Sequence, residues 1–241
     1  MPPRQGSPFT RKTVAFLRSL KRNNDREWFK AHKSDYEQHV RAPMIAVLAR
    51  LADDFRGFAP ELVSDPKVSL FRIYRDTRFS GDKTPLKTSA AAHFPHKTLG
   101  KSGGAGLYFE IAPQAVWIGG GIYMPESHEL AAIRAHIDAR HRTLRKIVEA
   151  KSFVRTAGAL HGEQLTRVPR GYVADHPAEH YLRFRQFLAG REYPAEFAYD
   201  AKFYPELIRM FREIAPLVRF LNEPILARPV DPLAFAEMKR A

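Results

Sequence analysis

Hydrophobic residues recur with the period of an α-helix toward both ends of the chain. The periodic segments begin at about residues 13, 35, 125 and 203. Residues three and four positions apart share one side of a helix, so each segment can bury one apolar side. Pro43 lies inside the second segment and lacks a backbone N–H, so we expect a kink or a restart at Arg41–Ala42. The last helix is predicted to end near Pro216.

The middle of the chain has the alternating pattern of β-strands instead. Strands are predicted over residues 67–75, 88–94, 106–112, 115–123 and 183–188. Only Pro113-Gln114 joins the third and fourth of these, which is too short for a crossover, so we expect them to pair antiparallel.

Helices, then a block of strands, then helices indicate an α+β fold. We predict a single domain in which an antiparallel sheet from the middle of the chain is packed by N- and C-terminal helices. This domain is placed at residues 9–222, between a loose N-terminal tail at 1–8 and a C-terminal tail at 223–241.

Composition adds that the chain is globular. Its 241 residues are 44% hydrophobic and 27% charged, which suits one large domain. There is no cysteine, which excludes disulfides and thiolate chemistry, and no apolar run approaches the roughly 18 residues that span a bilayer. We therefore expect a cytoplasmic protein without a membrane partner, and its oligomeric state stays open.

The net charge is strongly positive. Lys and Arg number 39 and Asp and Glu number 26, which gives +13. Such a charge favours association with anions such as nucleic acid, phosphorylated metabolites or acidic surfaces. A solvated basic surface without a specific partner is an equally good interpretation, because net charge concerns association and not fold.

Charged residues are densest in the segment from Arg72 to Lys87. The candidate ligand-binding residues there are Arg72, Arg75, Arg78, Ser80, Lys83 and Lys87. The guanidinium groups of arginine and the free N–H groups of a turn can donate hydrogen bonds to a phosphate or a carboxylate. Asp76 and Asp82 are candidate catalytic residues, since carboxylates among cations can transfer protons, hold a divalent metal or orient the arginines. Alternatively, both carboxylates pair with the arginines and pin the loop to the sheet.

Two other places are candidates for the same site. Asn24 and Arg26 would form a second wall, unless they serve only in helix capping and a surface pair. Gly121 ends a run of three glycines in a predicted strand, and glycines there indicate a bulge or a close approach of other atoms. A ligand and a neighbouring part of the protein explain such an approach equally well.

Two familiar motifs are incomplete. Gly100-Lys101-Ser102 resembles the end of a phosphate-binding loop, but Pro95 stands where the first glycine is required. The residues from His176 to His180 match H-x-x-E-H, but Pro177 sets the first histidine at a helix start and no third ligand follows. We therefore predict no metal site, and the cofactor stays unknown.

Two blocks of sequence resemble the domain of unknown function 2461 family. They run from Asn23 to Phe29 and from Arg72 to Thr88, and weaker similarity extends the match from Phe9 to Leu221. Leu86 departs from the pattern, because the family more often has an aromatic residue there. The resemblance implies a one-domain protein of bacteria and fungi, and it implies no particular activity or cofactor.

Three functions fit these observations, and whether the protein is an enzyme stays open. We favour a protein that binds, and in the enzymatic version acts on, a phosphorylated or other anionic ligand at Arg72–Lys87. The second is a nucleic-acid-binding module, whose stacking residues would be Tyr74, Phe79, Phe94, Tyr108 and Trp117. The third is a structural or partner-binding protein in which Arg75 and Asp76 belong to a buried ionic network. Carboxylates among the cations favour the first, since a nucleic-acid binder gains nothing from negative charge at its centre.

Overall fold

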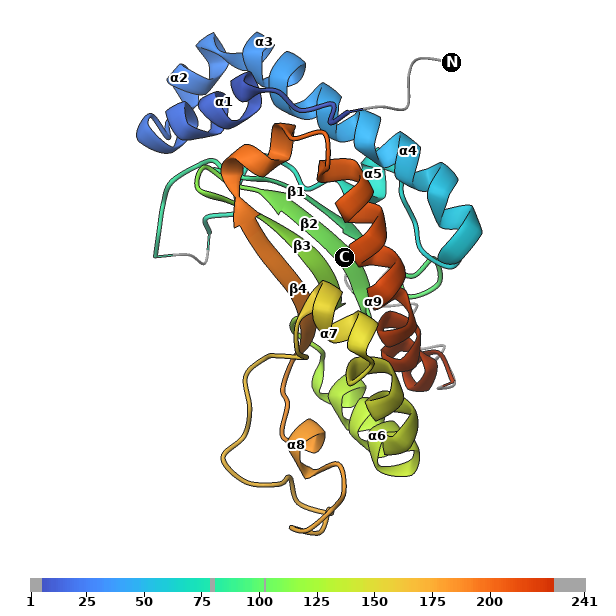
Figure 1. Cartoon of the computed structure of the whole chain (residues 1–241). Helices are drawn as coiled ribbons and strands as arrows, with labels where there is room; N and C mark the ends of the chain where they lie inside the picture. Colours follow the sequence, from blue (N-terminus) through green and yellow to red (C-terminus); the bar gives the residue numbers. More distant parts are fainter. Residues whose placement is uncertain (1–5, 79–80, 102, 228–241) are drawn as a thin grey trace.

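A layer of helices packs on one face of an antiparallel sheet (Figure 1). The computed structural model describes residues 6–78, 81–101 and 103–227. Within these residues, four strands form one sheet in the order β1-β2-β3-β4, with every neighbouring pair antiparallel. The strands are β1 (Ala90–Phe94), β2 (Gly106–Ile111), β3 (Ala115–Ile122) and β4 (Phe187–Pro194). The predicted α+β fold, with its sheet from the middle of the chain, is confirmed.

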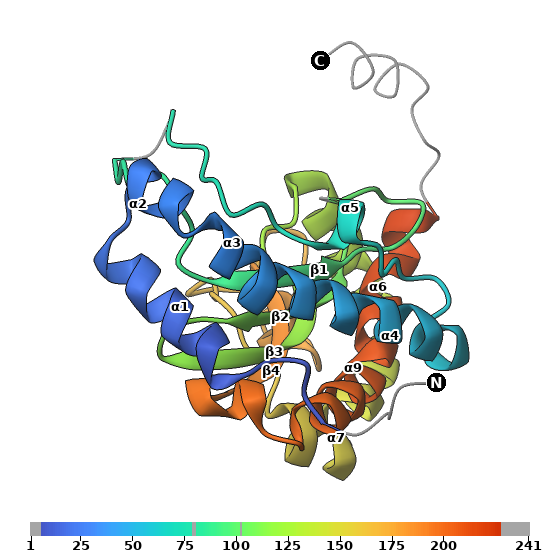
Figure 2. The ribbon, with the colours of Figure 1, turned by 90° about the horizontal axis from the view of Figure 1, so that it is seen from above.

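Helices precede and follow the strands. Those before are α1 (Arg11–Arg22), α2 (Arg26–Ala31), α3 (Lys33–Tyr36), the π-helix η1 (Glu37–Arg41), α4 (Ala42–Phe58) and α5 (Pro66–Ser69). Those after the first three strands are α6 (Ser127–Val148), α7 (Lys151–Ala157), α8 (Glu179–Leu182), the 3-10 helix η2 (Ala195–Tyr199) and α9 (Phe203–Leu226). Figure 1 shows α4 and α9 beside the sheet, and Figure 2 shows α1, α3 and α4 passing across it in the view from above.

The core lies between the sheet and the helices α4 and α9. Phe94 of β1 stacks on Phe109 of β2 with 6.2 Å between ring centroids, and Phe211 of α9 meets Phe94 edge-on at 5.5 Å. All three rings are fully buried. Burying a side chain of this kind stabilises the fold by about 1.5–3 kcal/mol, so this aromatic group fixes α9 on the sheet.

A π-helical turn resolves the conflict that Pro43 creates. The π-helix spans Glu37–Arg41, and α4 begins at Ala42 with the proline in its first turn. Helical turns precede the proline, and the His39 carbonyl four residues before it accepts a 2.6 Å hydrogen bond from the Thr13 hydroxyl instead. The kink or restart predicted at Arg41–Ala42 takes the form of this change from π-helix to α-helix, and the backbone of both residues stays helical.

Two of the predicted strands differ most from the structure. Residues 67–69 belong to the helical turn α5, because the Asp65 side chain accepts a hydrogen bond from the Lys67 N–H at 2.8 Å and so caps a turn. Only isolated bridges at Leu70 and Tyr74 remain of the strand predicted over 67–75. The strand predicted over 183–188 begins only at Phe187 and continues to Pro194.

The last helix does not end near Pro216 as predicted. Helix α9 continues to Leu226 with that proline inside it. A proline in a helix interior costs about 3 kcal/mol. Leu217, Phe220 and Leu221 follow it and are buried, and each contributes about 1.5–3 kcal/mol. Tertiary packing therefore outweighs the local preference.

The second face of the sheet is half-buried. His93, Tyr108, Glu110 and Trp117 point to this face, and their neighbours along each strand are buried in the core. Such alternation is typical of an antiparallel sheet with one face toward solvent.

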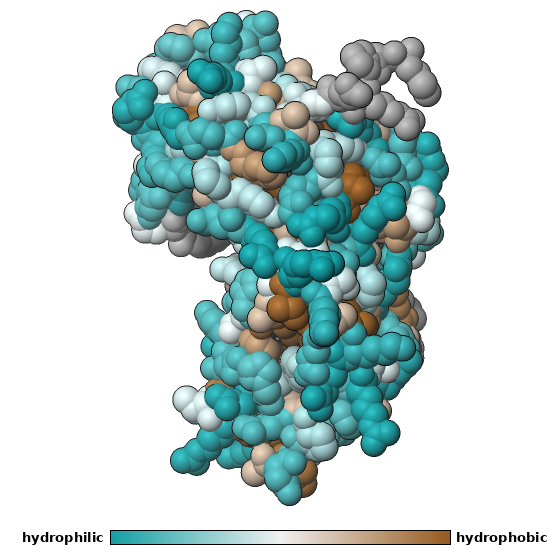
Figure 3. Space-filling model, in the orientation of Figure 1, coloured by the Kyte–Doolittle hydropathy of each residue, from teal (hydrophilic) through white to brown (hydrophobic). Residues whose placement is uncertain are grey.

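Hydrophilic side chains cover most of the molecular face drawn in Figure 3, and apolar residues appear there as separate patches. None of the helices in the described ranges combines the length and the apolar character needed to cross a membrane.

Candidate anion-binding site

The predicted site segment forms an arm, which we define as residues 73–87. Its two ends, residues 73–75 and 85–87, pair antiparallel through backbone hydrogen bonds of 2.9 and 2.7 Å and a bridge between Tyr74 and Leu86. The described residues between these ends, 76–78 and 81–84, belong to the tip of the arm, which extends away from the sheet in Figure 1.

Each carboxylate at the tip pairs with an arginine. Asp76 accepts two hydrogen bonds from the Arg78 side chain, at 3.1 Å from Nε and 2.7 Å from Nη2. Asp82 accepts hydrogen bonds from the Thr84 N–H at 2.9 Å and from Arg75 Nη1. The Arg78 side chain lowers the pKa of Asp76 to about 2, and the Thr84 N–H with Arg75 lowers the pKa of Asp82 to about 2. Such carboxylates are weak proton acceptors near neutral pH, so the geometry favours pairing over proton transfer.

The other predicted residues near the tip do not converge with these pairs. Lys83 donates from Nζ to the Thr77 carbonyl at 3.0 Å, and Arg26 is exposed in the first turn of α2. Ser80 lies outside the described residues.

The hypothesis of a buried ionic network required that Arg75 and Asp76 both be inaccessible. The Asp76 side chain is 56% exposed, whereas the Arg75 side chain is 25% exposed. A buried network at this pair is therefore contradicted.

The glycine run in β3 accommodates neighbouring parts of the protein. Gly121 has a φ of +128°, and a Cβ there would overlap the Phe187 carbonyl oxygen in β4. Gly119 and Gly190 leave room for the indole of Trp117, whose ring would lie 2.7 Å from a Cβ added at Gly190. The close approach predicted at these glycines is thus made by β4 and by an indole.

Arg72, at the base of the arm, lines a hollow of about 710 Å³. The hollow lies between α2, α3 and η1 on one side and residues 66–74 on the other, with Lys101 also in its wall. We call it the basic hollow. Its charged lining residues are Lys33, Glu37, Arg41, Lys67, Arg72 and Lys101. Hollows of this volume are large enough for small-molecule ligands.

The charges of the basic hollow are unbalanced. Five of its lining residues are cationic and one is a carboxylate, Glu37, which accepts a 3.1 Å hydrogen bond from Arg41. Among the residues that the structure describes, no carboxylate lies at ion-pair distance from Lys33, Lys67, Arg72 or Lys101. The field inside therefore attracts anions.

Aromatic rings supply the apolar part of the same wall. They belong to Phe29, Tyr36, Phe71 and Tyr74. Phe29 is buried and meets Tyr74 edge-on at 5.8 Å, while the Tyr74 residue is 54% exposed. Cationic groups beside fixed rings suit a ligand that has both an anionic group and an apolar part.

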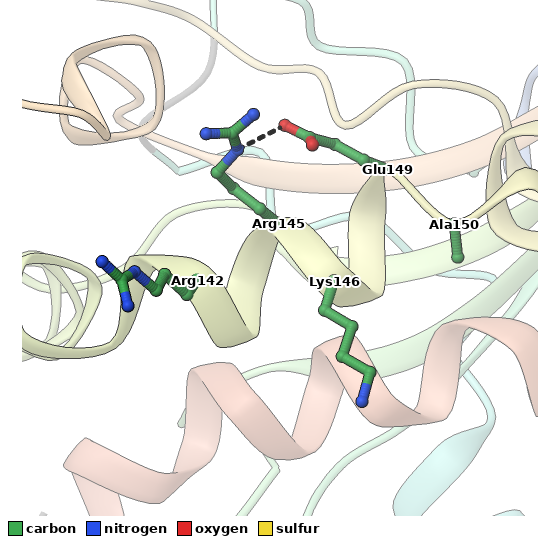
Figure 4. A pocket seen from close by; sticks show the side chains of 5 residues that line it. All are labelled: Arg142, Arg145, Lys146, Glu149 and Ala150. Atoms are coloured by element: carbon green, nitrogen blue, oxygen red, sulfur yellow. Dashed lines mark hydrogen bonds and ion pairs between the residues drawn. The ribbon is translucent and has the colours of Figure 1, made fainter.

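A second hollow, of about 370 Å³, lies along α6 (Figure 4). Arg145 donates from Nε to Glu149 at 2.9 Å. This pair neutralises one of the cations that line the second hollow. Figure 4 shows Arg142 and Lys146 pointing away from this pair and from each other. Its cations do not converge, so the basic hollow is the stronger candidate.

A family model covers most of the chain, including the arm and the basic hollow. It is described as a conserved hypothetical protein, DUF2461, and it matches residues 12–220. The chain belongs to this family. No curated protein and no solved structure matches this DUF2461 chain.

The two blocks that carry the DUF2461 resemblance meet at the base of the arm. Asn24 of the first block donates from Nδ2 to the Leu86 carbonyl at 2.9 Å and accepts from the Leu86 N–H at 3.1 Å. The Leu86 side chain is buried, so it packs in the core instead of stacking on a ligand. Asn24 therefore holds the arm against α2, which forms a wall of the basic hollow.

Asn24→Ala is expected to lower the free energy of unfolding by about 1–3 kcal/mol, because it leaves the polar backbone of Leu86 without its partners. The matched control is Asn23→Ala, which removes one exposed hydrogen bond to the Ser19 carbonyl. Urea denaturation of both variants measures the difference. Equal stabilities would show that the hydrogen bonds between Asn24 and Leu86 do not hold the arm.

Sequence reasoning found Arg72 but missed most of the basic hollow. Lys101 was examined only as part of an incomplete phosphate-binding loop. Lys33, Glu37 and Arg41 recur at intervals of four residues, which places them on one side of a helix. That spacing was the available signal for this wall.

Proposed function

We propose that this DUF2461 protein binds a small anionic ligand, with a phosphate or carboxylate group, in the basic hollow. The observation that carries the proposal is that five cationic residues and only one carboxylate line a space of about 710 Å³. Hydrogen bonds to charged groups contribute about 1.5–3 kcal/mol each, so two or three of these cations suffice for specific binding. Arg72 is the anchor, since its planar guanidinium can contact two oxygens of one anion.

A concave site of this size favours a small molecule over a nucleic acid. Of the residues named for base stacking, Phe94 is fully buried and Phe79 lies outside the described residues. Tyr108 and Trp117 are half-buried, and Tyr74 is exposed. A single-stranded nucleic acid needs an open basic groove with accessible rings, and the loss of Phe94 weakens that alternative.

Pyrophosphate is expected to raise the melting temperature of the full chain relative to sodium chloride at equal ionic strength. A ligand that binds only the folded state at 100 times its Kd stabilises by about 2.7 kcal/mol. For a domain of this size that corresponds to about 5–11 °C. Differential scanning fluorimetry measures the shift.

The same shift in both salts would overturn the proposal, because it would indicate screening and no site. Fluorescence anisotropy with a single-stranded oligonucleotide tests the alternative. Oligonucleotide binding that falls steeply with salt, together with no effect of pyrophosphate, would favour the nucleic-acid module.

A further inference from the structure

Lys87 places an amine against Phe71, whose ring lines the basic hollow. Its Nζ lies 4.6 Å from the centroid of the Phe71 ring, and the Nζ of Lys101 lies 6.0 Å from the same centroid. Phe71, Lys101 and Arg72 all line the basic hollow. The amines of Lys87 and Lys101 are therefore neighbours of the same ring in the wall of the basic hollow.

The surroundings of Lys87 lower the pKa of its amine below that of an ordinary lysine. The residue is half-buried, and within the described ranges no carboxylate lies at ion-pair distance from its amine. Burial lowers the pKa of Lys87 most, followed by the positive charges of Arg72 and Lys101, with a smaller lowering from Arg75. Glu110 acts in the opposite direction.

The opposing carboxylate is itself occupied. Glu110 accepts a hydrogen bond from the Tyr108 hydroxyl at 2.9 Å. A neutral amine carries the lone pair that attacks a carbonyl carbon, and lysines are activated when they are desolvated or placed beside other cations. Lys87 is half-buried and has Arg72 and Lys101 as cationic neighbours.

We propose that Lys87 forms an imine with an anionic carbonyl compound whose charged group is held by Arg72 and Lys101. The proposal rests on the proposed function, because those two cations supply the anion site. The neutral Nζ attacks the carbonyl carbon and forms a C–N bond. The carbonyl oxygen then leaves as water with the two nitrogen-bound protons, and a C=N bond remains. The step needs neither oxidant nor reductant, and the ligand class is an aldehyde or ketone with a phosphate or carboxylate group.

Pyridoxal phosphate is a suitable probe, because the molecule carries both an aldehyde and a phosphate group. The full chain is mixed with a limiting amount of the probe, reduced with borohydride to fix the imine, and mapped by peptide mass spectrometry. We expect Lys87 to be modified several-fold faster than Lys83, a lysine of the same arm whose amine is exposed and bonded to the Thr77 carbonyl. Pyridoxal, which lacks the phosphate, is expected to modify Lys87 more slowly.

Lys87→Arg separates the imine from anion binding. It keeps a positive charge but forms no imine under these conditions, so the adduct should disappear while the pyrophosphate-induced rise in melting temperature remains. If this variant does not fold, the inference is tested by the modified lysines that mass spectrometry finds in the wild-type chain. Equal modification of Lys83 and Lys87 would overturn the inference and leave anion binding intact. Equal rates with pyridoxal and its phosphate at Lys87 would overturn the anion-dependent step and count against the proposed function.

Discussion

Gly121→Ala is expected to lower the free energy of unfolding by about 3 kcal/mol or more, because strain at a special φ adds to overpacking. The residue has a φ of +128°, and a Cβ there would overlap the Phe187 carbonyl oxygen in β4. That oxygen belongs to backbone, so it cannot be relieved by a side-chain rotation. Strands β3 and β4 would have to separate locally, within the pairing that runs from Ala115 to Ile122 of β3.

The matched control is Gly171→Ala. Gly171 has a φ of +94° with no atom within 4 Å of an added Cβ, so its substitution carries only the backbone strain of about 1–2 kcal/mol. For a chain of this length, 3 kcal/mol lowers the melting temperature by about 6–12 °C. Calorimetry of the two variants compares the effects. If Gly121→Ala were as stable as Gly171→Ala but lost pyrophosphate binding, Gly121 would contact a ligand.

Local information predicted the fold well where the signal was periodic. The strands over 106–112 and 115–123 were placed within a residue of β2 and β3, since alternation and a two-residue joint are both visible in the sequence. The prediction was wrong where non-local packing decided the outcome. Pro216 is an example, because only the buried residues beyond it reveal why α9 continues.

The candidate site shows the same limit. The pairing of Asp76 with Arg78 spans two residues, so it could be weighed from sequence as one of two alternatives, and the structure has that pair. The basic hollow brings Lys33, Lys67 and Lys101 together from three distant segments. Their convergence depends on the packing of α3 against the residues that precede β1, which no local pattern encodes.

Arg72→Ala is expected to weaken pyrophosphate binding by about 10- to 150-fold. The variant loses a charge-assisted hydrogen-bond donor worth about 1.5–3 kcal/mol, and each 1.4 kcal/mol is a factor of ten in Kd. Arg78→Ala is the matched control, since Arg78 lies on the same arm and is paired with Asp76 outside the basic hollow. Isothermal titration calorimetry at fixed salt measures both affinities.

The comparison separates a specific site from the general effect of a +13 chain. Both substitutions remove one positive charge, so a diffuse attraction would weaken equally in the two variants. A contact in the basic hollow weakens only with Arg72. Arg72→Lys adds the last distinction, because it keeps the charge but cannot make two parallel hydrogen bonds to one anion. Full affinity in Arg72→Lys would show that charge alone holds the anion, and equal losses in Arg72→Ala and Arg78→Ala would contradict the site.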